Sequence, residues 1–118
     1  MTPQPKTVRF VGGARPRVAP LGGAWTDSGG DALAVQLPDD ASANEAAAHV
    51  PEAASLAGGT WVIVLPEPAR GRGLLAAFGR KPIARAARAG ALLLRGFVDI
   101  GAEVDPGSKM DLVYGRSP

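Results

Sequence analysis

Cysteine is absent from this chain of 118 residues, and histidine occurs once, at His49. Without a thiol the chain forms no disulfide, offers no thiolate nucleophile, and holds neither zinc nor an iron–sulfur cluster through sulfur. A single imidazole also argues against a transition-metal site built from protein ligands alone. His49 lies in a predicted helix without a neighbouring acid or nucleophile, so we interpret it as a surface residue and expect no metal.

Long apolar runs are also missing, because no stretch approaches the roughly 18 residues that a membrane span requires. The first residues show no signal-peptide pattern. A chain of this length is large enough for one hydrophobic core and too small for two. These features favour a single cytoplasmic domain without a transmembrane segment.

The net charge is only +2, but it hides blocks of opposite sign. Residues 27–67 contain seven acids and no base, whereas residues 68–98 contain seven bases and no acid. Such blocks either pair with each other inside one fold or present a charged face to a partner. The bases that we take as candidate partner-binding residues are Arg70, Arg72, Arg80, Lys81, Arg85 and Arg88.

Aromatic residues are few, and only Phe78 is interleaved with this basic block. Proteins that bind single-stranded nucleic acid combine positive charge with aromatic rings on which bases stack. The acidic blocks also weaken the field that would attract nucleic acid or an anionic membrane. We therefore expect mainly a solvated helix face, with an acidic protein as the alternative partner and with nucleic acid and membrane disfavoured.

A fully apolar segment, Trp61-Val62-Ile63-Val64-Leu65, follows Gly58-Gly59 and precedes Pro66. A strand without polar alternation has to be covered on both of its faces. The segment therefore predicts an interior strand of a parallel α/β sheet.

Shorter patterns predict further elements on both sides of this strand. Residues 7–11 and 31–37 are typical of strands. Ser42 and Glu45 have the spacing of a capping box, which marks the start of a helix. A second helix is expected over residues 82–94, with Arg85, Arg88 and Arg95 in one exposed sector opposite Ala89 and Leu92.

The chain closes with a predicted hairpin, in which residues 98–104 and 110–114 alternate about Asp105-Pro106-Gly107-Ser108. The predicted fold class is therefore α/β, with a truncated Rossmann-like mixed sheet of about four to five strands, two main helices and a C-terminal antiparallel hairpin. Residues 1–30 are expected to be irregular, with at most one short strand. Residues 31–118 are expected to form the α/β half-domain.

The order of these elements resembles the C-terminal half of class I S-adenosylmethionine-dependent methyltransferases. Leu56-Ala57-Gly58-Gly59 is similar to the helix end that feeds that family's fifth strand, and Glu67-Pro68 to the dipeptide that follows it. Gly96-Phe97 matches the start of the next strand, beside which a final antiparallel strand inserts. The resemblance covers roughly residues 31–118 and implies a methyltransferase-like fold.

The cofactor site that this resemblance would imply is poorly matched. The family builds it after the first strand with an acid and a Gly-x-Gly loop, and adds an acid on the second strand for the ribose hydroxyls. Here only Gly12 and Gly13 are candidates, and they lack the acid. We therefore expect no cofactor. In this respect the chain is more similar to the N-terminal domain of the anamorsin family than to a complete methyltransferase. That domain is a methyltransferase-like fold used for protein contacts.

A half-sheet of this kind leaves one face without a helix, because successive right-handed crossovers in one direction place both helices on the same side. Val62 and Val64 point away from Trp61, Ile63 and Leu65, and all five are apolar. Either residues 1–26 or a second chain must cover the free face, on which we expect Val62 and Val64. Trp25, in the irregular segment, is the candidate anchor residue for a partner.

Three functions follow from these observations. The first is a non-catalytic, methyltransferase-like module that acts through a protein partner or as a homodimer, in an adaptor, assembly or regulatory role. The second is a minimal or split S-adenosylmethionine-dependent methyltransferase completed by a partner. The third is a binder of acidic partners or nucleic acid through the basic helix. The sequence favours a protein that is not an enzyme.

Overall fold

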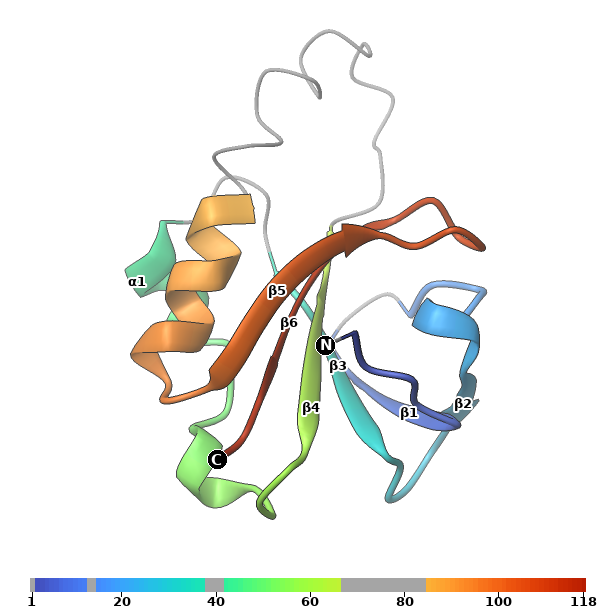
Figure 1. Cartoon of the computed structure of the whole chain (residues 1–118), viewed down its shortest axis with the longest axis horizontal. Helices are drawn as coiled ribbons and strands as arrows, with labels where there is room; N and C mark the ends of the chain where they lie inside the picture. The colour runs from blue at the N-terminus through green and yellow to red at the C-terminus, as the bar shows by residue number, and fades with distance from the viewer. Residues whose placement is uncertain (1, 13–14, 38–41, 67–84) are drawn as a thin grey trace, which may run out of the picture.

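The computed structural model describes residues 2–12, 15–37, 42–66 and 85–118. They form an α/β fold around one six-stranded sheet, in the order β2-β1-β3-β4-β6-β5 (Figure 1). In chain order the strands are β1 (Thr7–Val11), β2 (Ala24–Thr26), β3 (Ala32–Gln36), β4 (Trp61–Leu65), β5 (Val98–Val104) and β6 (Asp111–Arg116). The first four are parallel, and β6 is antiparallel to both of its neighbours, so the sheet is mixed.

The apolar segment 61–65 is the interior strand β4, as the sequence predicts. It lies between β3 and β6, and Val62, Ile63, Val64 and Leu65 are all 0% exposed. The apolar side chains on both faces of β4 are therefore buried in a core. Burial stabilises the folded state by about 25 cal/mol for each Å² of apolar surface removed from water. β4 links the two halves of the sheet.

Two α-helices lie on one face of the sheet (Figure 1). The first, α1 (Ala43–Ala47), begins as predicted at Ser42, whose Oγ accepts a 3.3 Å hydrogen bond from the amide of Glu45. The second covers residues 85–94 and ends at Gly96, where φ is 86°. Hydrogen bonds from the amides of Gly96 and Phe97 return to the carbonyls of Leu93 and Leu92, so the helix ends in a Schellman motif.

The core between helices and sheet joins side chains from both layers. The sheet contributes Leu33, Val35, Val62, Val64 and Val113, and the helices and their connections contribute Ala46, Ala47, Val50, Ala53, Ala91, Leu92 and Phe97. Val62 and Val64 thus face the helices, and the expectation that they lie on the helix-free face is wrong. Alternation along a strand separates its two faces, but it does not tell which face the helices cover.

The opposite face of the sheet carries a second core. It contains Val8, Ala32, Ala34, Ile63, Leu65, Leu112 and Tyr114, with Phe10, Leu21, Trp25, Trp61 and Met110 packed against them. Leu21 belongs to the 3₁₀ turn η1 (Pro20–Gly22), so the N-terminal segment folds back over this face. Either residues 1–26 or a second chain was expected to cover this face, and among the described residues it is the chain's own N-terminal segment that covers it.

The sequence does not predict the short strand β2, which raises the number of strands among the described residues to six. It has three residues and pairs with β1 through the register Val8↔Trp25. An edge strand of this length is held by its backbone and carries no apolar alternation that a sequence pattern can detect. The N-terminal segment therefore contributes two strands to the sheet rather than one.

The predicted hairpin is confirmed as β5 and β6, joined by the turn at Asp105. The pairing contains a bulge between Val98 and Gly101, at which Asp99 has a φ of 53°. A Cβ at Gly101 would lie 2.8 Å from the Tyr114 ring, so only glycine fits beneath that ring without movement.

The predicted orientation of the second helix is wrong. Arg88 is only 3% exposed and lies on the same face as the buried Ala91 and Leu92, whereas Leu93 is 66% exposed. Residues three and four positions apart share a helix face, so Arg88 stands on the side that packs on the sheet. Arg85 is exposed, as expected.

Candidate functional site

Ligands of open α/β sheets bind outside the carboxyl ends of the parallel strands. In this protein β1, β3 and β4 have their carboxyl ends on the same edge of the sheet, across the strand direction, and β6 begins beside them. Gly12 follows β1 there with a φ of 148°, a conformation that favours glycine. Gly13 lies outside the described residues. Of the two weak candidates for a cofactor loop, Gly12 is therefore placed at the appropriate edge.

An acid that the sequence did not single out lies at the same edge. Asp27 directly follows β2, the neighbour of β1, and the resemblance implies an acid on the second strand. Its side chain is fully exposed, and Arg15 Nη1 lies 3.9 Å from its Oδ1. Because the sequence does not predict β2, no sequence signal indicates Asp27.

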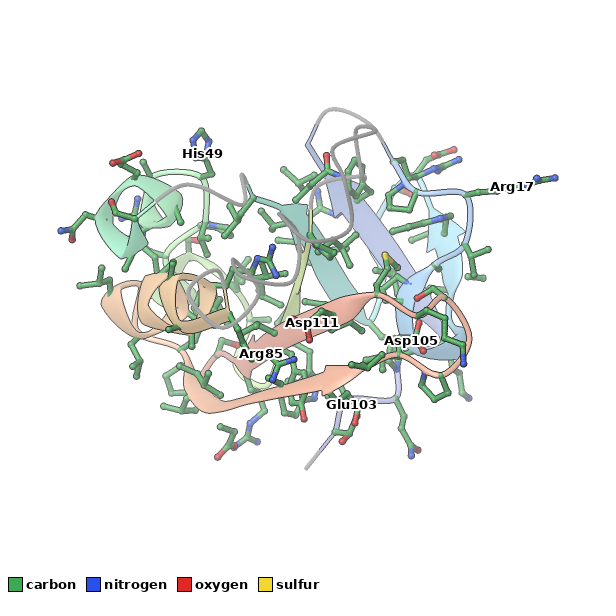
Figure 2. The ribbon with its side chains drawn as sticks, turned by 90° about the horizontal axis from the view of Figure 1, so that it is seen from above. Arg17, His49, Arg85, Glu103, Asp105 and Asp111 are labelled. Atoms are coloured by element: carbon green, nitrogen blue, oxygen red, sulfur yellow. The ribbon has the colours of Figure 1, made fainter. Side chains whose placement is uncertain are left out.

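The first residue of β6 brings a buried carboxylate to this edge. Arg85 Nε donates to Asp111 Oδ2 over 3.3 Å, and Arg85 Nη2 donates to Oδ1, so the pair is bidentate (Figure 2). The side chain of Asp111 is 9% exposed. Arg85, a candidate partner-binding residue, is thus already bound within the chain.

The other described bases of the basic block also contact the protein itself. Arg88 is buried and interacts within the chain. Arg95 Nε donates to the carbonyl of Ala47 over 2.6 Å, and its Nη1 lies 3.3 Å from Glu52 Oε1. Arg70, Arg72, Arg80 and Lys81 lie outside the described residues. The expected solvated basic face of the second helix is therefore not found over residues 85–94.

Trp25 is half-buried and anchors its own segment. Its Nε1 donates a 2.9 Å hydrogen bond to the carbonyl of Pro16, and its ring meets Phe10 edge to face at 5.6 Å. The guanidinium of Arg15 lies 5.6 Å from the centre of the Trp25 ring. These contacts hold residues 15–26 together; a contact with a partner stays a prediction.

A buried carboxylate fixes the N-terminal segment to the hairpin. Asp105 Oδ2 accepts from the amide of Leu21 at 3.2 Å and from the hydroxyl of Ser108 at 2.6 Å, and Oδ1 accepts from the amide of Gly107 at 3.3 Å. Burial alone raises the pKa of Asp105, but these hydrogen bonds outweigh it and lower the pKa below its ordinary value. Asp105 is therefore an ionised structural clip rather than an acid–base group.

A shallow groove runs between the helix over residues 85–94 and β5. Its volume is about 390 Å³, and it is lined by Arg85, Ala86, Ala89, Ile100, Gly101 and Ala102. Small apolar side chains dominate this lining. Because β5 ends the sheet, the groove opens along a strand edge.

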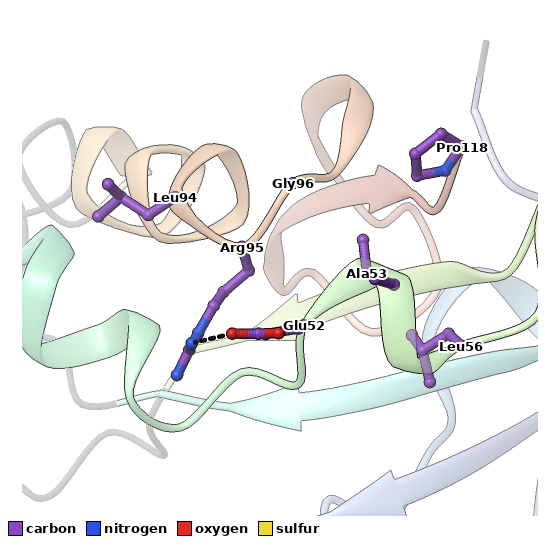
Figure 3. Close-up of a pocket in the computed structure, with 8 residues that line it drawn as sticks. Glu52, Ala53, Leu56, Leu94, Arg95, Gly96 and Pro118 are labelled. Carbon is purple, nitrogen blue, oxygen red and sulfur yellow. Dashed lines mark hydrogen bonds and ion pairs between the residues drawn. The ribbon is translucent and has the colours of Figure 1, made fainter.

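A second cavity, of about 450 Å³, lies at the other end of the sheet, beside the residues that precede β4 and β5 and follow β6 (Figure 3). Leu56, Leu94, Gly96 and Pro118 help to line it, and the ion pair of Glu52 and Arg95 stands beside them. Both charges are satisfied by each other, and the cavity lies at the amino ends of the parallel strands, where α/β folds seldom bind ligands.

The described parts of the chain contain no group of three or more His, Cys, Asp or Glu side chains arranged to hold a metal ion. His49 is exposed and points outward beyond α1 (Figure 2). Among the same residues, no helix is long and apolar enough to cross a membrane.

No family model, no curated protein and no solved structure matches the chain. Its function therefore has to be argued from the fold and from the surfaces described above.

Proposed function

We propose that this chain is a non-catalytic, methyltransferase-like α/β module that works through protein contacts, as an adaptor, assembly or regulatory subunit. The strand order supports the resemblance, since β6 lies between β4 and β5 and runs antiparallel to both. This is the arrangement that the resemblance implies for the last strand.

The observation that carries the proposal is the use of the segment between β1 and β2. In the family that the chain resembles, the stretch after the first strand builds the cofactor loop. Here its described residues include the turn η1, from which Leu21 packs on the helix-free sheet face and is tied to Asp105. A segment committed to covering the core is not available to enclose a cofactor.

Calorimetric titration with S-adenosylmethionine and with S-adenosylhomocysteine tests the proposal. We expect no saturable binding at millimolar ligand concentration. Binding with a micromolar Kd would overturn the proposal, because it corresponds to about −8 kcal/mol of binding free energy and requires a formed cofactor site. Thermal unfolding with and without each ligand supplies an independent readout, since a ligand that binds only the folded state raises Tm.

The second candidate function is a split methyltransferase, which one observation favours. Asp27 and Gly12 stand at the ends of adjacent parallel strands, where the family that the chain resembles binds the cofactor. That function predicts cofactor binding only in the presence of a partner chain, and its loss in Asp27→Asn. The ion pair with Arg15 and the full exposure of Asp27 make it the weaker candidate.

A further inference from the structure

The free side of β5 leaves backbone groups without a partner strand. β6 is the only neighbour of β5 in the described sheet. The amide of Asp105, just after β5, donates a 2.8 Å hydrogen bond to the carbonyl of Met110. Hydrogen-bonded pairs alternate along an antiparallel ladder, so Glu103 also points its backbone groups at β6, whereas Ala102 and Val104 point theirs away from it. In the described parts of the chain no backbone hydrogen bond reaches these outward groups, which are therefore open to one more strand.

The side chains of Ala102 and Val104 lie on the sheet face that carries the helices. Ala102 faces Val113 across the ladder, and Val113 belongs to the core between helices and sheet. Val104 is two positions further along the same face and is 56% exposed. Glu103 lies opposite Leu112 and so belongs to the other face. A strand added to this edge therefore meets apolar side chains on one face and a carboxylate on the other.

The groove beside β5 extends the apolar face toward the second helix. Ala86 and Ala89 line it from the helix, and Ile100 and Ala102 line it from β5. Leu93, four positions after Ala89 on the same flank of the helix, is 66% exposed. A strand paired with β5 directs every second side chain to this face. The groove therefore suits branched apolar side chains, which also favour extended backbone.

The charges around the edge favour a basic residue between two apolar ones. On the helix side Arg85 and Asp111 are bound to each other, so the groove does not call for a charged side chain. On the other face Glu103 Oε2 accepts a 3.2 Å hydrogen bond from the hydroxyl of Thr2. Among the described residues no base forms an ion pair with Glu103. A lysine or arginine directly opposite Glu103 on an added strand would supply that ion pair.

The length of the regular edge favours a short peptide over a second sheet. A bulge between Val98 and Gly101 interrupts the ladder, and Asp99 has a φ of 53° there. Regular pairing therefore runs only from Gly101 to Val104, about 13 Å at roughly 3.3 Å per residue. Joining two sheets along so short an edge would bury far less than the roughly 1,200 Å² of a stable interface. An extended peptide of a few residues fits this length.

We propose that β5 binds an extended peptide of another protein as an additional strand, with the pattern apolar–basic–apolar opposite Ala102, Glu103 and Val104. The two apolar side chains enter the groove beside the second helix, and the basic side chain meets Glu103 on the other face. The backbone of β5 supplies hydrogen bonds that any sequence can use, and the two faces select the side chains. This inference rests on the proposed function, because it names the kind of protein contact through which the module works.

NMR titration of isotope-labelled protein with the peptide acetyl-Thr-Val-Lys-Val-Thr-amide tests this contact. We expect saturable shifts with a Kd between roughly 10 μM and 1 mM, because so short a segment buries less surface than a standard interface. Near saturation the hydrogen exchange of the Ala102 and Val104 amides should slow at least about fivefold, since their N–H groups become bonded. The amide of Glu103 already points at β6 and should be little affected.

Reversal of charge separates the pairing with Glu103 from general electrostatic attraction. Glu103→Lys should weaken binding of this peptide at least about fivefold, and should strengthen binding of the same peptide with glutamate in place of lysine by a similar factor. Asp27→Lys changes the net charge equally beside β2, at the other edge of the sheet, and should leave both Kd values unchanged within about twofold.

A backbone variant tests the added strand without touching a side chain that holds the fold. Ala102→Pro removes an outward N–H that bonds nothing in the described chain, a change that edge strands tolerate, and should weaken binding at least about fivefold. The absence of shifts at millimolar peptide, or equal affinity for the lysine and glutamate peptides, would overturn the proposal. Shifts of the β5 amides with protein concentration alone would also overturn it, because a second copy would then occupy the edge. The titration with S-adenosylmethionine is independent of all these results, so the proposed function can fail or stand separately.

Discussion

The amide of Leu21 donates a 3.2 Å hydrogen bond to Asp105 Oδ2, across 84 positions of sequence. This bond joins the N-terminal segment to the turn between β5 and β6, on the sheet face that no helix of the described residues covers. Leu21 also packs against the core of that face. Leu21 and Asp105 together show how the N-terminal segment shields the second sheet face from water, since the helices of the described residues lie on the other face.

Replacing Asp105 by Ala should destabilise the fold by about 2–3 kcal/mol, because the amides of Leu21 and Gly107 lose their acceptor in a largely buried site. Urea unfolding followed by tryptophan fluorescence measures the change. Asp27→Ala, at a fully exposed carboxylate, is the control and should leave the unfolding curve unchanged. Equal curves for the wild type and Asp105→Ala would contradict the role of the clip.

The pH dependence of stability follows from the lowered pKa of Asp105. Its stabilisation is fully present above the ordinary pKa of 3.8 and is lost as the pH falls through the lower pKa of the folded state. Between neutral pH and pH 2, Asp105→Asn should therefore lose less stability than the wild type, with the difference developing below pH 4. Urea midpoints across this range measure it, and parallel curves would refute it.

Gly101→Ala should cost about 1–3 kcal/mol, because the new methyl group would lie 2.8 Å from the ring of the buried Tyr114. Gly107→Ala is the matched control, since its Cβ would meet no atom closer than Asp105 Oδ1 at 3.9 Å. Chemical unfolding of both variants measures the difference. A Gly101→Ala protein as stable as Gly107→Ala would show that the Tyr114 ring does not lie over Gly101.

Leu21 has a φ of 57°, in the left-handed region that costs a residue with a side chain about 1 kcal/mol. Leu21→Ala and Leu21→Gly lose the same packing on the sheet, but only glycine relieves the backbone. We therefore expect Leu21→Gly to be more stable than Leu21→Ala by about 1 kcal/mol, the reverse of the usual order. Thermal unfolding ranks the two variants, and the usual order would contradict the backbone conformation at Leu21.

The elements with a strong local pattern could be predicted from the sequence. Thr7–Val11 and Trp61–Leu65 form the strands expected from their apolar residues, and the capping box at Ser42 begins α1. The hairpin follows from its alternation and from the turn residues at Asp105. Each of these signals lies within a few neighbouring residues, so no knowledge of the tertiary structure is needed to use it.

The features that depend on tertiary contacts could not be predicted. β2 is stabilised by pairing with β1, and no property of Ala24–Thr26 alone indicates a strand. The sequence predicts Arg88 in one exposed sector with Arg85 and Arg95, although its position between Ala91 and Leu92 on the helix surface puts it against the sheet. The sides of Val62 and Val64 depend on where the helices pack, which the strand itself does not reveal.

The position of β5 at the edge of the sheet also depends on tertiary structure. The sequence places Val98 and Val104 in a strand but does not say that this strand ends the sheet. The sequence places the contact residues among the bases instead, but Arg85 and Arg88 of the second helix, and Arg95 just after it, contact other residues of the chain.

The coverage of the helix-free face by the chain's own N-terminal segment is tested most directly by NMR with a soluble paramagnetic agent, at a concentration where the protein is monomeric. The methyl groups of Ile63 and Leu65 should show almost no relaxation enhancement, whereas those of Val18 and Val104 in the same sample should be strongly broadened. Broadening of Ile63 and Leu65 to the level of Val104 would mean that the monomer leaves this face open, and would contradict the account.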